Sequence, residues 1–190
     1  MSKFETFNSP ELKCIKDVFN QLQHLQLDVN IAYIVESYIY KWIEEIHKKG
    51  YIIYRYRIKF GEKDGEYKGY YKDGNIFIQK SFINGILNGE CIKYYPNGKI
   101  FIQKSYINGN LNGEYKEYYK NGEKYEQKYY LDGQLNGTYT TWSSRGLLYS
   151  ERIFIKDKLQ QYKRWNEYGI ITDHIIYKNG KEINLNPNNN

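Results

Sequence analysis

The chain has 190 residues and a mass of 22.9 kDa, with 41% hydrophobic residues, a mean hydropathy of −0.81 and a formal net charge of +6. This length supports one compact domain, or a small cap joined to an array of repeats. The sequence holds no run of about 18 uncharged apolar residues, which excludes a membrane-spanning helix. Its first ten residues lack the apolar core of a secretion signal, so we expect an intracellular, cytoplasmic protein.

Chemistry-bearing residues are sparse. Cys14 and Cys91 lie in different sequence contexts and form no disulfide framework, which favours a reducing compartment. The three histidines show no metal-ligand spacing. The sequence also has no phosphate-binding loop, dinucleotide-binding glycine motif, zinc-protease motif or nucleophile elbow. We therefore expect no catalysis, no cofactor, no metal and no small-molecule substrate.

Residues 1–49 are predicted to be helical. Ser9 and Pro10 suit the start of a first helix, whose apolar positions share one face: Leu12, Ile15, Phe19 and Leu22. A second helix is predicted from an unbroken apolar stripe at i, i+3 and i+4 spacing: Ile31, Ile34, Val35, Tyr38, Ile39, Trp42, Ile43 and Ile46. Residues 47–49 suit its last turn, and Gly50 suits the position after it. We expect this α-helical region to cap the first edge of a sheet.

Glycines recur every 24 residues from about residue 50 to residue 180. Three series share this step, and their members are Gly65, Gly89, Gly113 and Gly137; Gly74, Gly98, Gly122 and Gly146; and Gly61, Gly85, Gly109 and Gly133. A degenerate fifth unit runs from about Gln160 to Gly180 and is one residue short. This periodicity predicts a repeat array.

Each repeat predicts a β-hairpin. In the first unit a tyrosine-rich run leads into Asp73-Gly74, and a β-rich run over 75–83 follows. Asp-Gly and Asn-Gly favour two-residue type I′ turns, so the predicted structural turn glycines are Gly74, Gly98, Gly122 and Gly146. The junction from Asn84 to Gly89 is expected to be the longer connection between hairpins. Short antiparallel connections throughout predict a single-layer meander of about eleven strands.

A two-residue loop at Asp73-Gly74 places aromatic residues opposite one another. The expected pairs are Tyr70–Phe77, Tyr94–Phe101, Tyr118–Tyr125 and Trp142–Tyr149. A three-residue loop would change this register. Such pairs contribute about 0.2–1 kcal/mol each, and we interpret the aromatic stripe as sheet core in preference to a ligand-stacking face.

The repeat resembles the variant form of the MORN repeat. One full unit carries the pattern: Gly113, Tyr115, Tyr118, Tyr119, Asn121, Gly122, Tyr130, Asp132, Gly133 and Leu135. The resemblance covers about residues 50–180 and departs at Cys91, at Pro96, at 143–145 and in the last unit. It implies an elongated antiparallel sheet over residues 50–181, used as a scaffold or contact surface and sometimes near membranes. Residues 182–190 are expected to form a disordered, Asn-rich tail.

The N-terminal region is also similar to a degenerate F-box core. The matching residues are Leu27, Val29, Ile31, Ile34, Val35, Tyr38 and Ile39. This similarity implies binding to a Skp-type ubiquitin-ligase adaptor, although Gln26 replaces the usual proline. F-box-like starts joined to repeats are a layout of large-DNA-virus proteins, and the excess of Lys, Asn, Ile and Tyr is typical of A+T-rich genomes. A viral source would place the protein in host cytoplasm.

Four cations occupy the same place in successive units: Lys80, Lys104, Lys128 and Arg152. They lie two strands apart, about 9.5 Å, on the same face as an aromatic column two residues further on. This ladder is a candidate surface for an anionic partner, either an acidic protein or anionic lipid; no nucleic-acid recognition motif is present, so we do not expect nucleic-acid binding. The alternative is that lysine stems lie across tyrosine rings, while Glu66, Glu90 and Glu114 dilute the charge.

These observations predict a non-enzymatic repeat scaffold that mediates protein–protein interaction through a sheet face or the repeat junctions. Two other roles stay open. One is an F-box-like substrate adaptor for a ubiquitin ligase, and the other is a peripheral membrane tether that uses the basic ladder.

Overall fold

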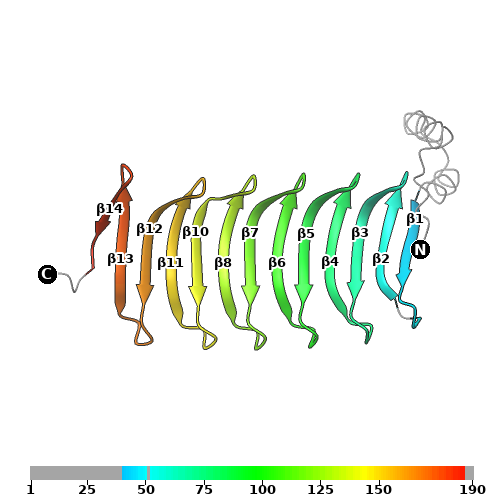
Figure 1. Cartoon of the computed structure of the whole chain (residues 1–190), viewed down its shortest axis with the longest axis horizontal. Coiled ribbons are helices and arrows are strands. Elements are labelled where there is room, and N and C mark those ends of the chain that lie inside the picture. The colour runs from blue at the N-terminus through cyan, green and yellow to red at the C-terminus, as the bar shows by residue number, and fades with distance from the viewer. Residues whose placement is uncertain (1–39, 51, 187–190) are drawn as a thin grey trace, which may run out of the picture.

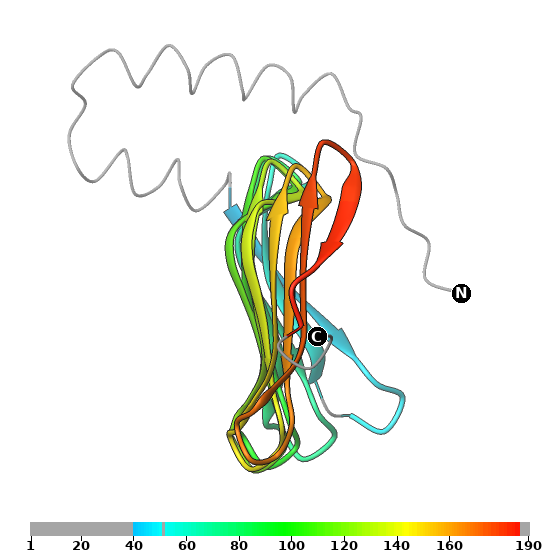
Figure 2. The ribbon, with the colours of Figure 1, turned by 90° about the vertical axis from the view of Figure 1, so that its left-hand side faces the viewer.

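The computed structural model describes residues 40–50 and 52–186. These residues form a single antiparallel sheet of fourteen strands, in which each strand follows its neighbour along the chain (Figure 1). Seen from its end, the sheet is one bent layer (Figure 2). The predicted meander is therefore confirmed, with more strands than the eleven or so expected from the sequence.

From β2 to β8 the strands alternate between eight and nine residues, because the repeat is uniform there. Their bounds are β1 (Tyr40–Ile46), β2 (Ile52–Lys59), β3 (Glu62–Tyr70), β4 (Ile76–Ile83), β5 (Ile86–Tyr94), β6 (Ile100–Ile107), β7 (Asn110–Tyr118), β8 (Lys124–Leu131), β9 (Gln134–Leu135), β10 (Gly137–Trp142), β11 (Leu148–Ile155), β12 (Lys158–Trp165), β13 (Ile171–Lys178) and β14 (Lys181–Asn184). The short β9 pairs with β8, and β10 continues alongside β8 after it.

The predicted second helix is wrong over residues 40–46, which form the strand β1. Ile43 lies opposite Tyr56 in β2 and packs against the aromatic cluster, whereas Trp42 lies on the other face. A short apolar run fits a helix or a strand, and here the unpaired edge of β2 supplies hydrogen-bond partners that favour the strand. The rest of the two predicted helices, residues 10–39, lies outside the described residues. So do the residues of the predicted adaptor-binding helix.

The two long edges of the sheet carry different turns, and the predicted assignment of the turn types is wrong. At Asp73-Gly74 the loop has three residues: the amide of Tyr71 donates to the carbonyl of Asn75 at 2.7 Å, and the amide of Gly74 donates to the carbonyl of Tyr71 at 3.0 Å. Gly74 has φ +88°, while Asp73 has no positive φ. A type I′ turn requires positive φ at both central residues, so this is a different turn.

Type I′ turns close the opposite edge, at the top of Figure 1. In the first junction Asn84 has φ 47° and Gly85 has φ 78°, and Ile83 pairs directly with Ile86. The junction expected to be long is therefore the tight turn. The equivalent turns are Phe60-Gly61, Asn108-Gly109, Asp132-Gly133, Lys156-Asp157 and Asn179-Gly180.

The three-residue loop shifts the aromatic register by one residue. Tyr70 lies opposite Ile76, and the ring of Tyr71 contacts that of Phe77 at a centroid distance of 5.6 Å. The predicted pairs are therefore wrong, since Tyr94, Tyr118 and Trp142 likewise lie opposite other residues. The observed ring pairs that replace two of them are Tyr95–Phe101 and Tyr119–Tyr125, at 4.8 and 5.1 Å.

A single layer buries few side chains. Among the described residues, the buried hydrophobic ones are Tyr56, Tyr67, Phe82 and Cys91, and all lie on one face. We call it the aromatic face. The first three of these side chains form a cluster near the N-terminal end of the sheet.

The C-terminal edge is formed by β14, which pairs with β13 from Lys178–Lys181 to Ile175–Asn184. The disorder predicted for residues 182–184 is therefore wrong. The amide of Leu185 donates to the carbonyl of His174 at 2.7 Å and continues this pairing. Residues 187–190 lie outside the described part.

Candidate interaction surfaces

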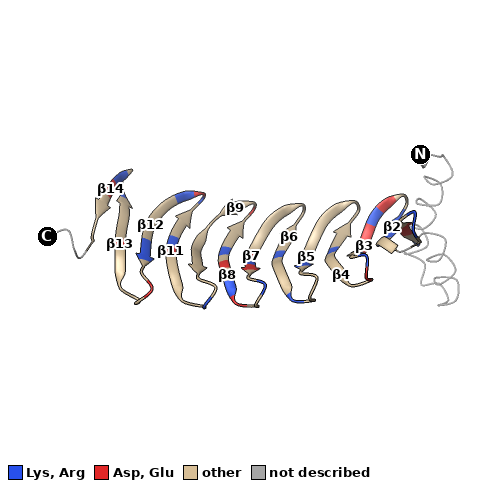
Figure 3. Ribbon diagram, turned by 60° about the horizontal axis from the view of Figure 1, so that its bottom comes forward, with Lys and Arg blue, Asp and Glu red and all other residues tan. Residues whose placement is uncertain are grey.

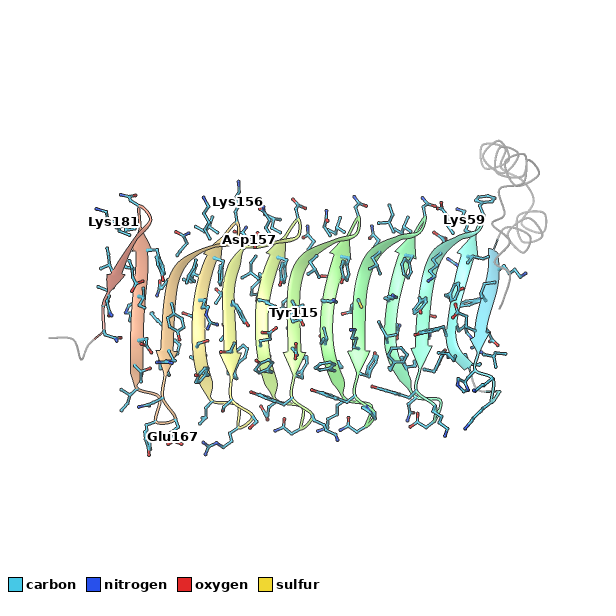
Figure 4. All side chains as sticks on the ribbon, viewed as in Figure 1. Lys59, Tyr115, Lys156, Asp157, Glu167 and Lys181 are labelled. Carbon is cyan, nitrogen blue, oxygen red and sulfur yellow. The ribbon has the colours of Figure 1, made fainter. Side chains whose placement is uncertain are left out.

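A row of cations and tyrosines crosses the aromatic face, with neighbours on adjacent strands. From β3 to β12 its members are Tyr67, Lys80, Cys91, Lys104, Tyr115, Lys128, Tyr139, Arg152 and Tyr162. Tyr115 marks the middle of this cation–tyrosine row in Figure 4. The structure thus brings all four predicted ladder cations together on one face, and basic positions recur along the array in Figure 3.

The ladder cations lie against aromatic rings. The Nζ of Lys80 is 4.6 Å from the ring centroid of Tyr67, and the Nζ of Lys128 is 4.5 Å from that of Tyr115. All four cations are half-buried. Their apolar stems cover the rings, as the alternative interpretation of the sequence predicts. The ladder therefore presents less charge to solvent than four freely exposed cations would.

The glutamate column lies on the opposite face, because adjacent residues of a strand alternate between faces. Gln103 donates to Glu90 at 2.6 Å and Gln127 donates to Glu114 at 2.7 Å. Glu114 is also paired with Lys116, and the hydrogen bond from that ammonium lowers the pKa of Glu114. The glutamates therefore do not dilute the ladder, and the expectation that they do is wrong. We call this surface the polar face.

Burial shifts the pKa values of several side chains on the aromatic face. It raises the pKa of Tyr115 and of Tyr139, whose hydroxyls also donate to carboxylates. It lowers the pKa of Lys80 and raises that of the Cys91 thiol, despite the two lysines beside it. Cys91 replaces a ring in the cation–tyrosine row and is only 4% exposed, so it is a packed and weakly ionised side chain.

A second surface was missed in the sequence: a row of apolar side chains beside the type I′ turns. We call it the isoleucine row, and its members are Ile83, Ile86, Ile107, Leu131 and Ile155. Each is between 51% and 55% exposed. Ile83 follows Phe82, which lies on the aromatic face, so the row lies on the polar face. The available signal was an apolar residue directly before four of the tight turns, at 24-residue steps: Ile83, Ile107, Leu131 and Ile155.

The structure also locates the predicted turn glycines. The turn glycines Gly74, Gly98, Gly122 and Gly146 all lie in the three-residue loops and have positive φ. Within residues 40–50 and 52–186 no group of three His, Cys, Asp or Glu side chains could hold a metal ion. In the same part of the chain no helix is long and apolar enough to cross a membrane.

The fold defines the class of the protein as an elongated antiparallel repeat array. Three consecutive segments, residues 63–84, 87–108 and 111–132, match the MORN repeat variant. Each segment holds the two strands joined by a three-residue loop and ends at the asparagine or aspartate of a type I′ turn. MORN repeats are generally non-enzymatic modules that interact with proteins or membrane lipids. No curated protein matches the chain.

Proposed function

We propose that this chain is a non-enzymatic scaffold that binds a partner protein through the isoleucine row. The observation that supports the proposal is the regular exposure of five apolar side chains along one edge of the sheet. Isolated exposed apolar residues are normal, whereas exposed apolar residues that recur at the same place in successive repeats are typical of an interaction surface. The MORN match supports an interaction role of this general kind.

The spacing of the row favours an α-helix as the bound element. Ile83, Ile107, Leu131 and Ile155 lie on alternate strands of the sheet, about 9.5 Å apart. Side chains seven residues apart on a helix are about 10.5 Å apart along its axis. The two repeats differ by about 1 Å per step, so a helix lying along the row stays within about 3 Å of register over all four positions. The partner is therefore an amphipathic helix with apolar residues at heptad spacing, lying across the strands.

Lysines beyond the C-terminal end of the row add a charged part to this edge. Lys156 and Lys181 lie along the same long edge in Figure 4, toward the C-terminal end of the sheet, and Lys158 follows Asp157 there. A helix whose acidic end lies over these lysines packs its apolar face against the isoleucine row and pairs its carboxylates with the lysines.

The test is affinity capture followed by mass spectrometry with three forms of the full chain. These are the wild type, an edge variant (I83S, I107S and L131S) and a ladder variant (K80Q, K104Q and K128Q). The edge substitutions remove only exposed apolar surface, so the edge variant should stay folded. We expect the ladder variant to retain partners that the edge variant loses. A synthetic peptide of the captured helix should then bind the wild type at least tenfold more tightly than the edge variant.

Two outcomes of the same experiment would overturn the proposal. One is capture of the same partners by the edge variant and the wild type, with loss only in the ladder variant, which would move the interface to the aromatic face. The other is recovery of a Skp-type adaptor by all three forms and its loss from a fourth form, I34D, added to the same capture, which would favour the adaptor role. Sedimentation with anionic vesicles at low salt tests the membrane role, where only the ladder variant should lose binding.

A further inference from the structure

The aromatic face contains a cavity of about 360 Å³ between β8, β10 and β11, beside the three-residue loops. Five aromatic side chains line it: Tyr119, Tyr125, Tyr139, Trp142 and Tyr149. Thr141 and Ser150 form the floor, and Arg152 lies at one side. The volume is within the range of small-molecule sites, and aromatic walls with a few polar groups are their usual lining.

A departure from the repeat provides the floor of this cavity. Ser150 occupies the position of Ile78 and Ile102 in earlier units, 72 and 48 residues before it. Its side chain is fully buried at 0% exposure, and its hydroxyl lies 2.7 Å from that of Thr141. The unit directly before it has Glu126 at this position. Serine lacks the branched apolar side chain of isoleucine, so this unit keeps space and a hydroxyl where the first two units have a filled apolar position.

Arg152 differs from the other arginines of the chain. Arg55, Arg57, Arg145 and Arg164 each pair with a carboxylate. Within the part of the chain that the structure describes, Arg152 pairs with none, and its guanidinium stacks at 5.3 and 5.1 Å from the ring centroids of Tyr139 and Tyr162. Stacking occupies the faces of the guanidinium, and its N–H donors at the rim stay available to an oxyanion.

We propose that this cavity binds a small organic anion with an aromatic ring, such as an aryl carboxylate or an aryl phosphate. The ring lies against the aromatic walls, where offset and edge contacts are favourable. The anionic group accepts hydrogen bonds from Arg152. If Ser150 donates to Thr141, the Thr141 hydroxyl hydrogen is free to donate to the same group. This site lies on the face opposite the isoleucine row and does not depend on the partner proposed above.

The test is an NMR titration of the full chain with phenyl phosphate, benzoate and, as a neutral control, phenol. We expect saturable shifts at Tyr119, Thr141, Trp142 and Arg152 with both anions, and at least tenfold weaker binding of phenol. R152Q should weaken anion binding about tenfold or more, because a charge-assisted hydrogen bond is lost. The matched control is K104Q, which removes a cation at the equivalent position of an earlier unit and should leave binding unchanged.

S150I provides a second variant that tests the space in the cavity. It introduces the residue type of the first two units and should abolish binding while the spectrum of the folded sheet is retained. Absence of saturable shifts at millimolar concentration of either anion would overturn the proposal. So would equal weakening by R152Q and K104Q, because binding would then follow net charge and not the cavity.

Discussion

The hydroxyl of Tyr95 donates a hydrogen bond to the backbone carbonyl of Tyr118, in the next repeat, at 2.7 Å. The same bond joins Tyr71 to Tyr94 at 2.7 Å and Tyr119 to Trp142 at 3.0 Å. Each bond spans 23 residues and links the loop ends of neighbouring hairpins. These contacts couple adjacent units, as expected for an array whose stability depends on nearest-neighbour interactions.

Replacement of Tyr95 by phenylalanine should therefore weaken the coupling between two units. We expect Y95F to lower the free energy of unfolding by about 1 kcal/mol, since one hydrogen bond is lost and a carbonyl loses its partner. Urea denaturation measures this change. The control is Y94F, because no hydrogen bond from the Tyr94 hydroxyl is found among the described residues. An equal loss in both variants would argue against the coupling.

Gly122 should not tolerate a β-branched residue. It has φ +100° and donates its amide to the carbonyl of Tyr119 at 2.8 Å. We expect G122V to cost about 1–3 kcal/mol, because the left-handed region is strained for valine, and to fray the units beyond the loop. K120V, in the same loop, should cost much less. A thermal melting curve unchanged by G122V would contradict the loop geometry.

Asn108 and Asn97 distinguish the two kinds of turn. Asn108 has φ 49°, whereas Asn97 has no positive φ and accepts a hydrogen bond from the amide of Lys99 at 3.1 Å. N108V should cost about 1–2 kcal/mol more than N108G, because valine is strained at positive φ. N97V loses two exposed side-chain hydrogen bonds, that from Lys99 and one to the carbonyl of Lys120 at 3.4 Å, without backbone strain, and should be milder. If chemical denaturation ranks N97V as the more damaging, the type I′ turns have been assigned to the wrong edge.

The Cys91 thiol should react slowly in the folded protein. Burial raises its pKa, which lowers the thiolate fraction at any given pH below that pKa, and the packed position restricts access. In a C14S background, we expect labelling by iodoacetamide near pH 8 to be at least tenfold slower in buffer than in concentrated guanidinium chloride. Equal rates in the two solvents would show that the aromatic face opens freely at Cys91.

Glu114 should contribute to the acid dependence of stability. Its pKa is lowered in the folded protein, chiefly by the hydrogen bond from Lys116. The contribution is present above the ordinary glutamate pKa of about 4.3 and is lost as the pH falls through the lower folded value. E114Q should therefore show a flatter fall in stability below about pH 4.3 than the wild type. K116Q should flatten the same region, and an unchanged slope in both variants would exclude the pair as a cause.

The sequence determined the repeat, its 24-residue step and the antiparallel meander, because glycine spacing and short connections are local properties. It also placed the four ladder cations on one face, since strand alternation follows directly from residue spacing.

Only the tertiary structure decided which Asn-Gly or Asp-Gly pair forms which turn. Asp73-Gly74 and Asn84-Gly85 carry similar turn signals, but the pairing of the flanking strands makes one a three-residue loop and the other a type I′ turn. That choice shifts the aromatic pairs by one residue and directs Ile83 to the polar face. The strand at 40–46 likewise depends on pairing with the edge of β2, and a local apolar stripe in the sequence does not predict that pairing. Local spacing fixes the period of an array, whereas register and edge pairing depend on contacts between strands, and these exist only in the folded sheet.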